Sequence, residues 1–202
     1  MKKSVLYIHG KGGQAEEAEH YKVLFPDYDV IGLDYKGQTL WETKKELLQT
    51  YRQLNALYEH IDIIANSIGA YFAMNALSDT HISRAFFISP IVDMEKLIKD
   101  MMQWAGVTED MLEEKKEIKT AFGETLSWEY LRYVRENPIM WNVPTDILYG
   151  KNDNLTAFET ISSFAENHNA TLTVMQNGEH WFHTEEQMQF LDRWLKQCLR
   201  AE

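Results

Sequence analysis

The sequence has little of the residues that crosslink a chain or loosen it. Its 202 residues include one cysteine, four prolines and ten glycines. A single cysteine cannot form an intramolecular disulfide, and so few prolines and glycines leave little room for disordered linkers. We expect Cys198 to pack on the apolar side of a last helix, because its spacing from Leu191, Trp194 and Leu195 is helical. One domain, with or without an insertion, accounts for this length.

Positive charge is also scarce, and long hydrophobic runs are missing. The chain has 20 Lys and Arg against 31 Asp and Glu, a formal net charge of -11. Nucleic acid and anionic membrane surfaces repel such a protein, so we expect neither as a partner. The first apolar run, residues 5–8, is too short for a signal-peptide core and leads into a glycine-rich loop. We therefore expect no export signal, no membrane span and a cytoplasmic location.

What the sequence does contain is an alternation of short apolar runs and helical patterns. Strands are expected at residues 4–9, 29–33, 62–66, 84–89, 146–149 and 171–175. Helices are expected at residues 16–25, 43–58, 67–77, 157–167 and 185–199. Strands that are apolar on both faces belong in a parallel sheet covered by helices. The alternation predicts an α/β fold, a doubly wound and mainly parallel six-stranded sheet in one domain, residues 1–202.

Residues 93–137 interrupt this alternation, because they contain no convincing strand. Asp93, Thr108 and Ser127 each stand where an N-cap would begin a helix, so we expect a helical insertion. Its large apolar side chains could pack over the sheet, line a pocket, or do both. Met is adaptable against apolar ligands. We take three residues of the insertion as candidate substrate-binding residues: Met101, Met102 and Trp104.

Residues 61–75 carry the main chemical motif, a strand, a turn and a helix with Ser67 at the tip. Residues 65–69 read Ala-Asn-Ser-Ile-Gly, with small outer residues because strand and helix nearly touch at such a turn. The turn lifts the hydroxyl out of the sheet edge and sets the Ile68 N–H at a helix N-terminus. Ser67 is therefore a candidate nucleophile. It could equally be a plain N-cap on this motif alone.

A serine nucleophile needs a base, and the base needs a carboxylate to orient it. In a parallel sheet these groups belong to the loops that follow the carboxyl ends of the strands. Three such loops stand out, at residues 9–13, 150–154 and 177–183, and they supply both imidazole and carboxylate side chains.

Four motifs in order resemble the α/β-hydrolase superfamily. They are His9-Gly10, Ala65-Asn66-Ser67-Ile68-Gly69, Gly150-Lys151-Asn152-Asp153 and Gly178-Glu179-His180, which follow that family's order of Ser, Asp and His. The resemblance covers nearly the whole chain outside residues 93–137, where the family commonly inserts a cap. Ala65 stands where the family more often has glycine.

The resemblance implies a role for each matching residue. Ser67 would be the nucleophile, His180 the general base and acid, and Asp153 the carboxylate that orients the imidazole. The N–H groups of Lys11 and Ile68 would form the oxyanion hole, with that of Gly12 as the alternative to Lys11.

Alternatives to these assignments remain at two positions. Asp153 could be an Asx-turn residue only, which would leave Asp93 as the acid. His183 is the rival of His180 as base. The prediction of a metal site at Glu179, His180 and His183 is weak, because two histidines at this spacing have no third strong ligand nearby. The loop at residues 9–13 lacks the residue order of a phosphate-binding loop, so we expect neither a metal nor a cofactor.

These observations predict a serine hydrolase, carboxylesterase-like, that cleaves a small ester or related acyl compound through an acyl-enzyme intermediate. Thioesterase, amidase, lactonase and C–C hydrolase chemistry remain open, because one triad serves them all. The alternative from another class is a protein that keeps the fold for binding or regulation and has lost turnover.

Overall fold

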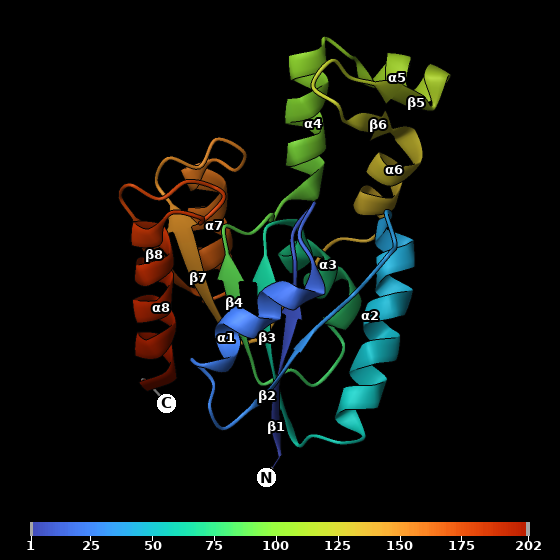
Figure 1. The fold of residues 1–202 in the computed structure, drawn as a ribbon. Helices are drawn as coiled ribbons and strands as arrows, with labels where there is room; N and C mark the ends of the chain where they lie inside the picture. The colour runs from blue at the N-terminus through green and yellow to red at the C-terminus, as the bar shows by residue number, and fades with distance from the viewer. Residues whose placement is uncertain (1, 201–202) are drawn as a thin grey trace. The chain divides into compact units, whose positions relative to one another are not determined.

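In the computed structural model, which describes residues 2–200, the chain forms a six-stranded sheet (Figure 1). The strand order is β2-β1-β3-β4-β7-β8, and each neighbouring pair is parallel. The strands are β1 (Lys3–Ile8), β2 (Asp29–Gly32), β3 (His60–Asn66), β4 (Arg84–Ile88), β7 (Thr145–Gly150) and β8 (Thr171–Met175). The prediction of six strands in a doubly wound α/β fold is confirmed.

Helices cover both faces of this sheet. They are α1 (Glu19–Lys22), α2 (Leu40–Asn55), α3 (Ile68–Leu77), α7 (Phe158–Asn167) and α8 (Glu185–Arg200). Tyr7, Ile64 and Phe86 are neighbours across β1, β3 and β4, and they share one core cluster with α1 and α8. The crossovers through α2, α3 and α7 run along the opposite face, as right-handed connections require. Among residues 2–200, no helix is long and apolar enough to cross a bilayer.

The strand order reverses at β1, and this reversal decides where function is expected. The chain passes from β1 to β2 on one side and builds the rest of the sheet outward from β3 on the other. Open α/β sheets bind ligands at the carboxyl ends of the strands beside such a reversal. The loop after β1 and the turn after β3, which carries Ser67, both lie at this edge.

The first helix is shorter than the pattern predicted. Residues 16–25 were expected to be helical throughout, but a 3₁₀ turn, Ala15–Ala18, leads into the four residues of α1. The chain then leaves the helix through a tight turn, in which the N–H groups of Leu24 and Phe25 both donate to the carbonyl oxygen of Tyr21. The apolar spacing that predicted a longer helix includes Val23, which lies beyond α1 and is 79% exposed.

The second helix begins and ends three residues earlier than predicted. Thr39 caps it: its hydroxyl accepts a bond from the Glu42 N–H (3.4 Å), while the Glu42 carboxylate accepts one from the Thr39 N–H (3.2 Å). This reciprocal capping box fixes the start of α2 at Leu40. Leu57, which falls within the predicted range, lies beyond the end of the helix and is 64% exposed.

Cys198 lies in the core, as its spacing predicted. It is buried on α8, and burial, helped by the charge of Asp146, raises the pKa of its thiol to about 12. The guanidinium of Arg84 donates to Asp146 (2.8 Å) and to the carbonyl oxygen of Cys198 (2.9 Å). These bonds join α8 to the amino-terminal ends of β4 and β7, and Ser67 follows the carboxyl end of β3 at the other end of the sheet. A buried thiol with a raised pKa is a poor nucleophile, so Cys198 has a packing role.

The chain divides into two compact units, residues 1–92 with 140–202, and residues 93–139. The second unit contains α4 (Met94–Ala105), α5 (Glu109–Lys115), β5 (Glu117–Lys119), β6 (Thr125–Ser127) and α6 (Trp128–Glu136). Asp93, Thr108 and Ser127 begin its helices, and each side chain accepts a bond from the N–H three residues later (2.9, 3.2 and 3.3 Å). The three predicted N-caps are confirmed.

The prediction that this segment has no strand is wrong. β5 and β6 form an antiparallel hairpin, closed by a bond from the Thr120 N–H to the carbonyl oxygen of Glu124 (2.8 Å). Gly123 takes the positive φ of 89° that the turn requires. Three residues in each strand are too few to show an apolar–polar alternation, which is why the pattern was missed.

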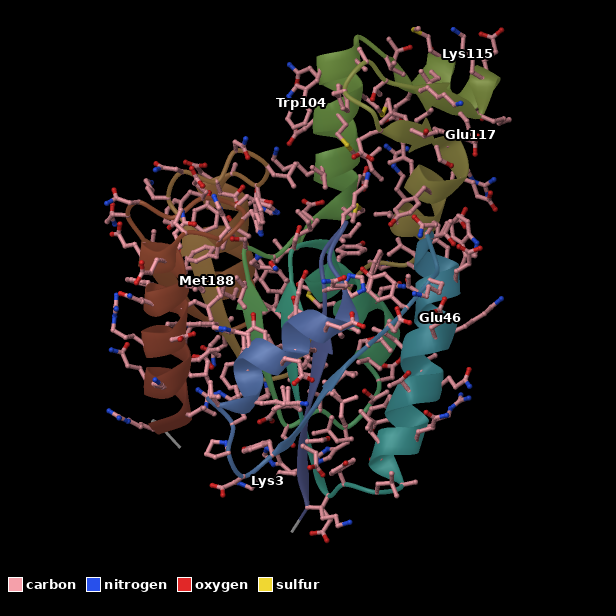
Figure 2. All side chains as sticks on the ribbon, viewed as in Figure 1. Lys3, Glu46, Trp104, Lys115, Glu117 and Met188 are labelled. Carbon is pink, nitrogen blue, oxygen red and sulfur yellow. The ribbon has the colours of Figure 1, made fainter. Side chains whose placement is uncertain are left out.

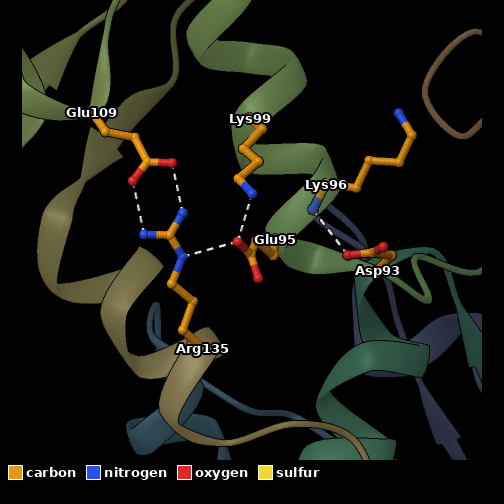
Figure 3. A network of polar contacts seen from close by, with 6 residues as sticks. All are labelled: Asp93, Glu95, Lys96, Lys99, Glu109 and Arg135. Carbon is orange, nitrogen blue, oxygen red and sulfur yellow. Dashed lines mark hydrogen bonds and ion pairs between the residues drawn. The ribbon is translucent and has the colours of Figure 1, made fainter.

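An ion-pair network links the three helices of the second unit (Figure 3). Arg135 on α6 donates two bonds to Glu109 at the start of α5 (2.8 and 2.6 Å) and one to Glu95 on α4 (2.9 Å). Lys99 also pairs with Glu95 (2.8 Å). The bonds from Lys99 and then Arg135 lower the pKa of Glu95, and those from Arg135 lower the pKa of Glu109. A bidentate pair within a network holds geometry better than an isolated surface pair does.

Candidate active site

Ser67 is the pivot between β3 and α3, and its backbone is strained. Its φ of 53° and ψ of -121° lie in a region that costs a non-glycine residue about 1–3 kcal/mol. Two bonds hold it there: its N–H donates to the carbonyl oxygen of Ile88 (3.0 Å), and its own carbonyl oxygen accepts from the Ile91 N–H (3.0 Å). The strand-to-helix turn predicted from residues 65–69 is therefore present.

The small residues around Ser67 are needed, but for a different contact from the one we expected. A Cβ on Gly69 would lie 2.5 Å from the carbonyl oxygen of Ile8 and 2.6 Å from that of His9. A Cβ on Gly10 would lie 3.1 Å from the Cβ of Ser67. The close approach is thus between the start of α3 and the end of β1. It places the loop after β1 directly beside Ser67.

Ser67, His180 and Asp153 form a continuous row of hydrogen bonds. The distance from Ser67 Oγ to His180 Nε2 is 2.8 Å, and that from His180 Nδ1 to Asp153 Oδ2 is 2.7 Å. A carboxylate can only accept, so Nδ1 carries the proton and donates it to Asp153. In the neutral imidazole Nε2 is then an acceptor, which receives the Ser67 hydroxyl proton. This tautomer is the one that lets the imidazole act as a base.

Asp153 makes the contacts that both of the weighed alternatives require. Its Oδ1 accepts bonds from the N–H groups of Leu155 (2.8 Å) and Thr156 (2.9 Å), which makes an Asx turn, while Oδ2 faces His180. The side chain is fully buried, so these bonds replace its hydration. Burial and, second, the Asp153 charge raise the pKa of Tyr149 to about 12. Its protonated phenol donates to the carbonyl oxygen of Thr156 (2.8 Å).

Two glycines bring the loops of Asp153 and His180 together. A Cβ on Gly150 would lie 2.5 Å from the carbonyl carbon of Gly178, and one on Gly178 would lie 2.9 Å from the Cα of Gly150. The loops are also bonded, since the Asn152 N–H donates to the carbonyl oxygen of Gly178 (2.8 Å). The two backbones are in contact, and that contact sets the distance between the carboxylate and the imidazole.

The loop after β1 is a tight turn beside the start of α3. The Gly13 N–H and the His9 ring Nδ1 both donate to the carbonyl oxygen of Gly10 (3.1 and 2.8 Å), and Gly12 has a positive φ of 75°. Lys11 follows Gly10, which contacts Ser67, and Ile68 is the first residue of α3. Of the two predicted oxyanion-hole residues, Ile68 follows Ser67 at a helix N-terminus, and Lys11 follows the glycine that lies beside Ser67.

Solved structures of similar architecture were compared with this geometry. Est1E from Butyrivibrio proteoclasticus, solved with ferulic acid bound, aligns with a TM-score of 0.75 at 18% identity, over 100% of this chain and 89% of its own. The α/β-hydrolase domain-containing protein 10 from mouse aligns with a TM-score of 0.74 at 15% identity, over 98% and 90%. An esterase from Pyrococcus furiosus aligns with a TM-score of 0.64 at 19% identity, over 98% and 80%.

The chain has the α/β-hydrolase fold. Likeness at this level of identity shows the fold alone, so the roles of individual residues rest on the site itself. No protein-family model and no curated protein sequence matches the chain.

The rival acid and base have other partners in this α/β-hydrolase fold. His183 donates from Nδ1 to the carbonyl oxygen of Trp181 (2.8 Å), and its ring stacks on the Trp181 ring. Asp93 caps α4 in the second unit. Within residues 2–200 no group of three or more Asp, Glu, His or Cys side chains is arranged to hold a metal ion. Of the weighed candidates, His180 and Asp153 are the pair joined to Ser67.

The three candidate substrate-binding residues belong to α4 in the second unit, and they do not share one face. Met102 is buried and follows Met94 and Ile98 along the packed side of the helix. Met101 is half-buried. Trp104 projects from α4 with 56% of its surface exposed (Figure 2), and it meets the Phe122 ring edge-on at 6.2 Å. Met101 and Trp104, three positions apart, are the two that keep part of their surface exposed.

One residue that supports the site was not found from the sequence. Tyr35, in the loop after β2, stacks its ring on the imidazole of His9 at 4.2 Å and donates its hydroxyl to the carbonyl oxygen of His9 (3.0 Å). Burial raises the pKa of this phenol, which keeps it a donor. The Tyr35 ring also meets Phe72 of α3 edge-on at 5.5 Å, so it holds the loop after β1 against the start of that helix. A lone tyrosine in a loop gives no sequence signal of such a contact.

Proposed function

We propose that this protein is a serine hydrolase, carboxylesterase-like, which cleaves a small ester through an acyl-enzyme intermediate. The observation that carries the proposal is the row of two hydrogen bonds from Ser67 through His180 to the buried Asp153. A row of this kind has little structural use, because Ser67 neither caps α3 through its side chain nor occupies a relaxed backbone conformation.

The chemistry follows from the direction of these bonds. His180 Nε2 takes the proton of Ser67 as Oγ attacks the ester carbonyl carbon, and the carbonyl electron pair moves onto its oxygen. Asp153 stabilises the imidazolium that forms. The tetrahedral intermediate then breaks the bond to the leaving oxygen, which receives the proton from Nε2. Water, activated by the same imidazole, hydrolyses the acyl-enzyme and restores Ser67.

The developing oxyanion needs donors that are already oriented. We assign this role to the N–H groups of Lys11 and Ile68, with Gly12 as the alternative to Lys11. Support comes from the contact of Gly10 with Ser67 and from the position of Ile68 at the start of α3. Backbone donors of this kind contribute about 3–4 kcal/mol each to transition-state stabilisation.

The substrate class is proposed from the site and from the compared proteins. The compared protein from Pyrococcus furiosus is described as an esterase, which favours an ester over a thioester, amide or C–C bond, and the ferulic acid bound to Est1E is a carboxylic acid, the acid product of such a hydrolysis. The net charge of -11 favours a neutral or cationic substrate and disfavours nucleic acid. The mechanism needs no cofactor. A cytoplasmic location remains part of the proposal.

The second unit, residues 93–139, is proposed to be the cap that selects the acyl group. It is inserted between β4 and β7, and two exposed aromatic rings, those of Trp104 and Phe122, meet on its surface. Large apolar side chains exposed together mark binding surfaces more often than plain connections.

Turnover of p-nitrophenyl esters from acetate to octanoate tests the proposal. A serine hydrolase releases nitrophenol from at least one ester well above the buffer rate, with saturation at rising ester concentration. If the fold is retained for binding alone, the purified protein will leave every ester in the series at the buffer rate.

The same series tests the role of the cap. Met101→Ala removes a half-buried side chain from the exposed side of α4, so the preferred acyl length should lengthen by about two carbons. The matched control is Met111→Ala in α5, the same change at another partly exposed methionine, which should keep the wild-type profile. Equal relative rates for wild type and Met101→Ala across the series would show that the cap is structural only.

Gly150→Ala tests how the two loops are held. The added Cβ would lie 2.5 Å from the backbone of Gly178, so the loop that carries His180 must move. A displacement of about 1 Å in a catalytic group can lower the rate about a hundredfold. We expect that loss in kcat/KM with a folded protein. Gly123→Ala is the control: the added Cβ meets nothing within 4 Å, and only the positive φ of 89° at this position, far from the two loops in sequence, is unfavourable. An equal effect of both substitutions would contradict this account.

A further inference from the structure

Trp181 follows His180 directly, and it is the most exposed aromatic ring described in the chain, with 68% of its surface open. An indole exposed to this extent forgoes much of the free energy that its burial would provide. Its neighbour on the other side, Phe182, is buried in the core cluster with α8. Three consecutive residues thus have a hydrogen-bonded imidazole, an exposed indole and a buried phenyl ring.

The exposed ring is held in place. The imidazole of His183 stacks on it with ring centres 4.3 Å apart and planes 17° apart. His183 is fixed in turn, because its Nδ1 donates to the carbonyl oxygen of Trp181 (2.8 Å) and its backbone N–H donates to Gln187 on α8 (3.0 Å). One face of the indole is covered by the imidazole. The large exposed fraction leaves the other face open and flat.

The direction of proton transfer says which part of a substrate lies nearest to this face. His180 Nε2 must deliver its proton to the leaving oxygen, so the leaving group has to lie on the His180 side of Ser67. The acyl group, by contrast, stays bonded to Ser67 Oγ. Trp181 is linked to His180 through the backbone, and its exposed ring is therefore our candidate contact for the alcohol part of an ester.

We propose that Trp181, backed by His183, is the leaving-group subsite and that it selects esters of aromatic alcohols. This inference rests on the proposed serine hydrolase function. An aromatic ring placed on the open face would complete a parallel stack of three rings, imidazole, indole and substrate. Offset parallel stacking of aromatic rings is favourable beyond the area that it buries, which separates an aromatic alcohol from an aliphatic one of the same size.

Three butyrate esters with a common acyl group test the subsite: benzyl, cyclohexylmethyl and ethyl butyrate. The wild type should prefer the benzyl over the cyclohexylmethyl ester about fivefold in kcat/KM. Trp181→Ala should remove this preference, and Trp181→Phe should keep most of it, because a phenyl ring still stacks. Leu57→Ala, which removes another exposed apolar side chain from the end of α2, should leave the preference as in the wild type.

A second measurement reads the subsite without turnover. The indole N–H signal of Trp181, identified by its loss in Trp181→Phe, should shift in a ¹H–¹⁵N spectrum on addition of benzyl alcohol and much less with cyclohexylmethanol.

Hydrolysis of ethyl butyrate separates the subsite from the proposed function. If ethyl butyrate is hydrolysed but Trp181→Ala keeps the benzyl preference, the subsite is overturned and the hydrolase stands. An equal loss on all three esters would make Trp181 structural and would also overturn the subsite. If no ester is hydrolysed, the proposed function fails, and the spectrum decides: an unshifted Trp181 signal overturns the subsite, while a selective shift supports an aromatic-alcohol site.

Discussion

Ser67→Ala should fold like the wild type and lose hydrolysis of a short activated ester by a factor of about a thousand or more. The substitution removes the nucleophile but leaves the oxyanion donors and the binding surface, which together account for the residual rate. The measurement is kcat/KM for p-nitrophenyl butyrate, with the circular dichroism spectrum and the melting temperature as checks of folding. Activity near that of the wild type would remove Ser67 from the mechanism.

Ser89 offers a matched control for this substitution. It follows β4, the strand next to β3, and like Ser67 it has a positive φ, which is 43° at Ser89. It is fully buried, and its hydroxyl has no hydrogen-bond partner among residues 2–200, while its N–H donates to the carbonyl oxygen of Leu148 (2.8 Å). Removing an unpaired buried hydroxyl costs little. Ser89→Ala should therefore keep activity within about twofold of the wild type.

His180→Ala should cost nearly as much as Ser67→Ala, again about a thousandfold, because the Ser67 hydroxyl then lacks an acceptor for its proton. It should also leave Asp153 without its imidazole partner while Asp153 keeps its two backbone donors, so the loop should stay folded. Partial recovery of the rate with added imidazole would identify the lost group as a base.

His183→Ala is the comparison that makes this result specific. Its imidazole bonds to the carbonyl oxygen of Trp181 and not to Ser67, so its loss should lower kcat/KM only a few-fold, through looser packing of Trp181. Both variants should be measured with the same ester and pH. A larger loss in His183→Ala than in His180→Ala would move the base to His183.

The sheet could be predicted from the sequence because its four central strands, β1, β3, β4 and β7, are buried on both faces. A continuous apolar run such as residues 84–89 has few other uses in a soluble α/β protein. The start of α2 could also have been predicted, since Thr39 and Glu42 have the spacing of a capping box. The apolar spacing alone predicts a start three residues too late. The β5–β6 hairpin could not, because three-residue strands carry no measurable period.

The loops that form the site could be predicted from the sequence, but the distances between their side chains could not. Parallel strands deliver their following loops to one edge, so Ser67, Asp153 and His180 could be assigned to the same region from their order along the chain. The distance between Asp153 and His180 depends on the contact of Gly150 with Gly178. The distance of the loop after β1 from Ser67 depends on the contact of Gly69 with the end of β1. Such contacts join segments far apart in sequence, and a glycine alone does not reveal its neighbour.

Covalent labelling by a fluorophosphonate tests the central claim most directly. A serine activated by His180 and Asp153 should form an adduct at phosphorus, which resembles the acyl-transfer transition state, whereas a serine that only begins a helix should not react. Mass spectrometry should find a single adduct on Ser67. The adduct should be lost in His180→Ala and should form more slowly as the pH falls and the imidazole becomes protonated. No adduct on the folded protein with reagents of several sizes, or an adduct on Ser89 instead, would contradict the account.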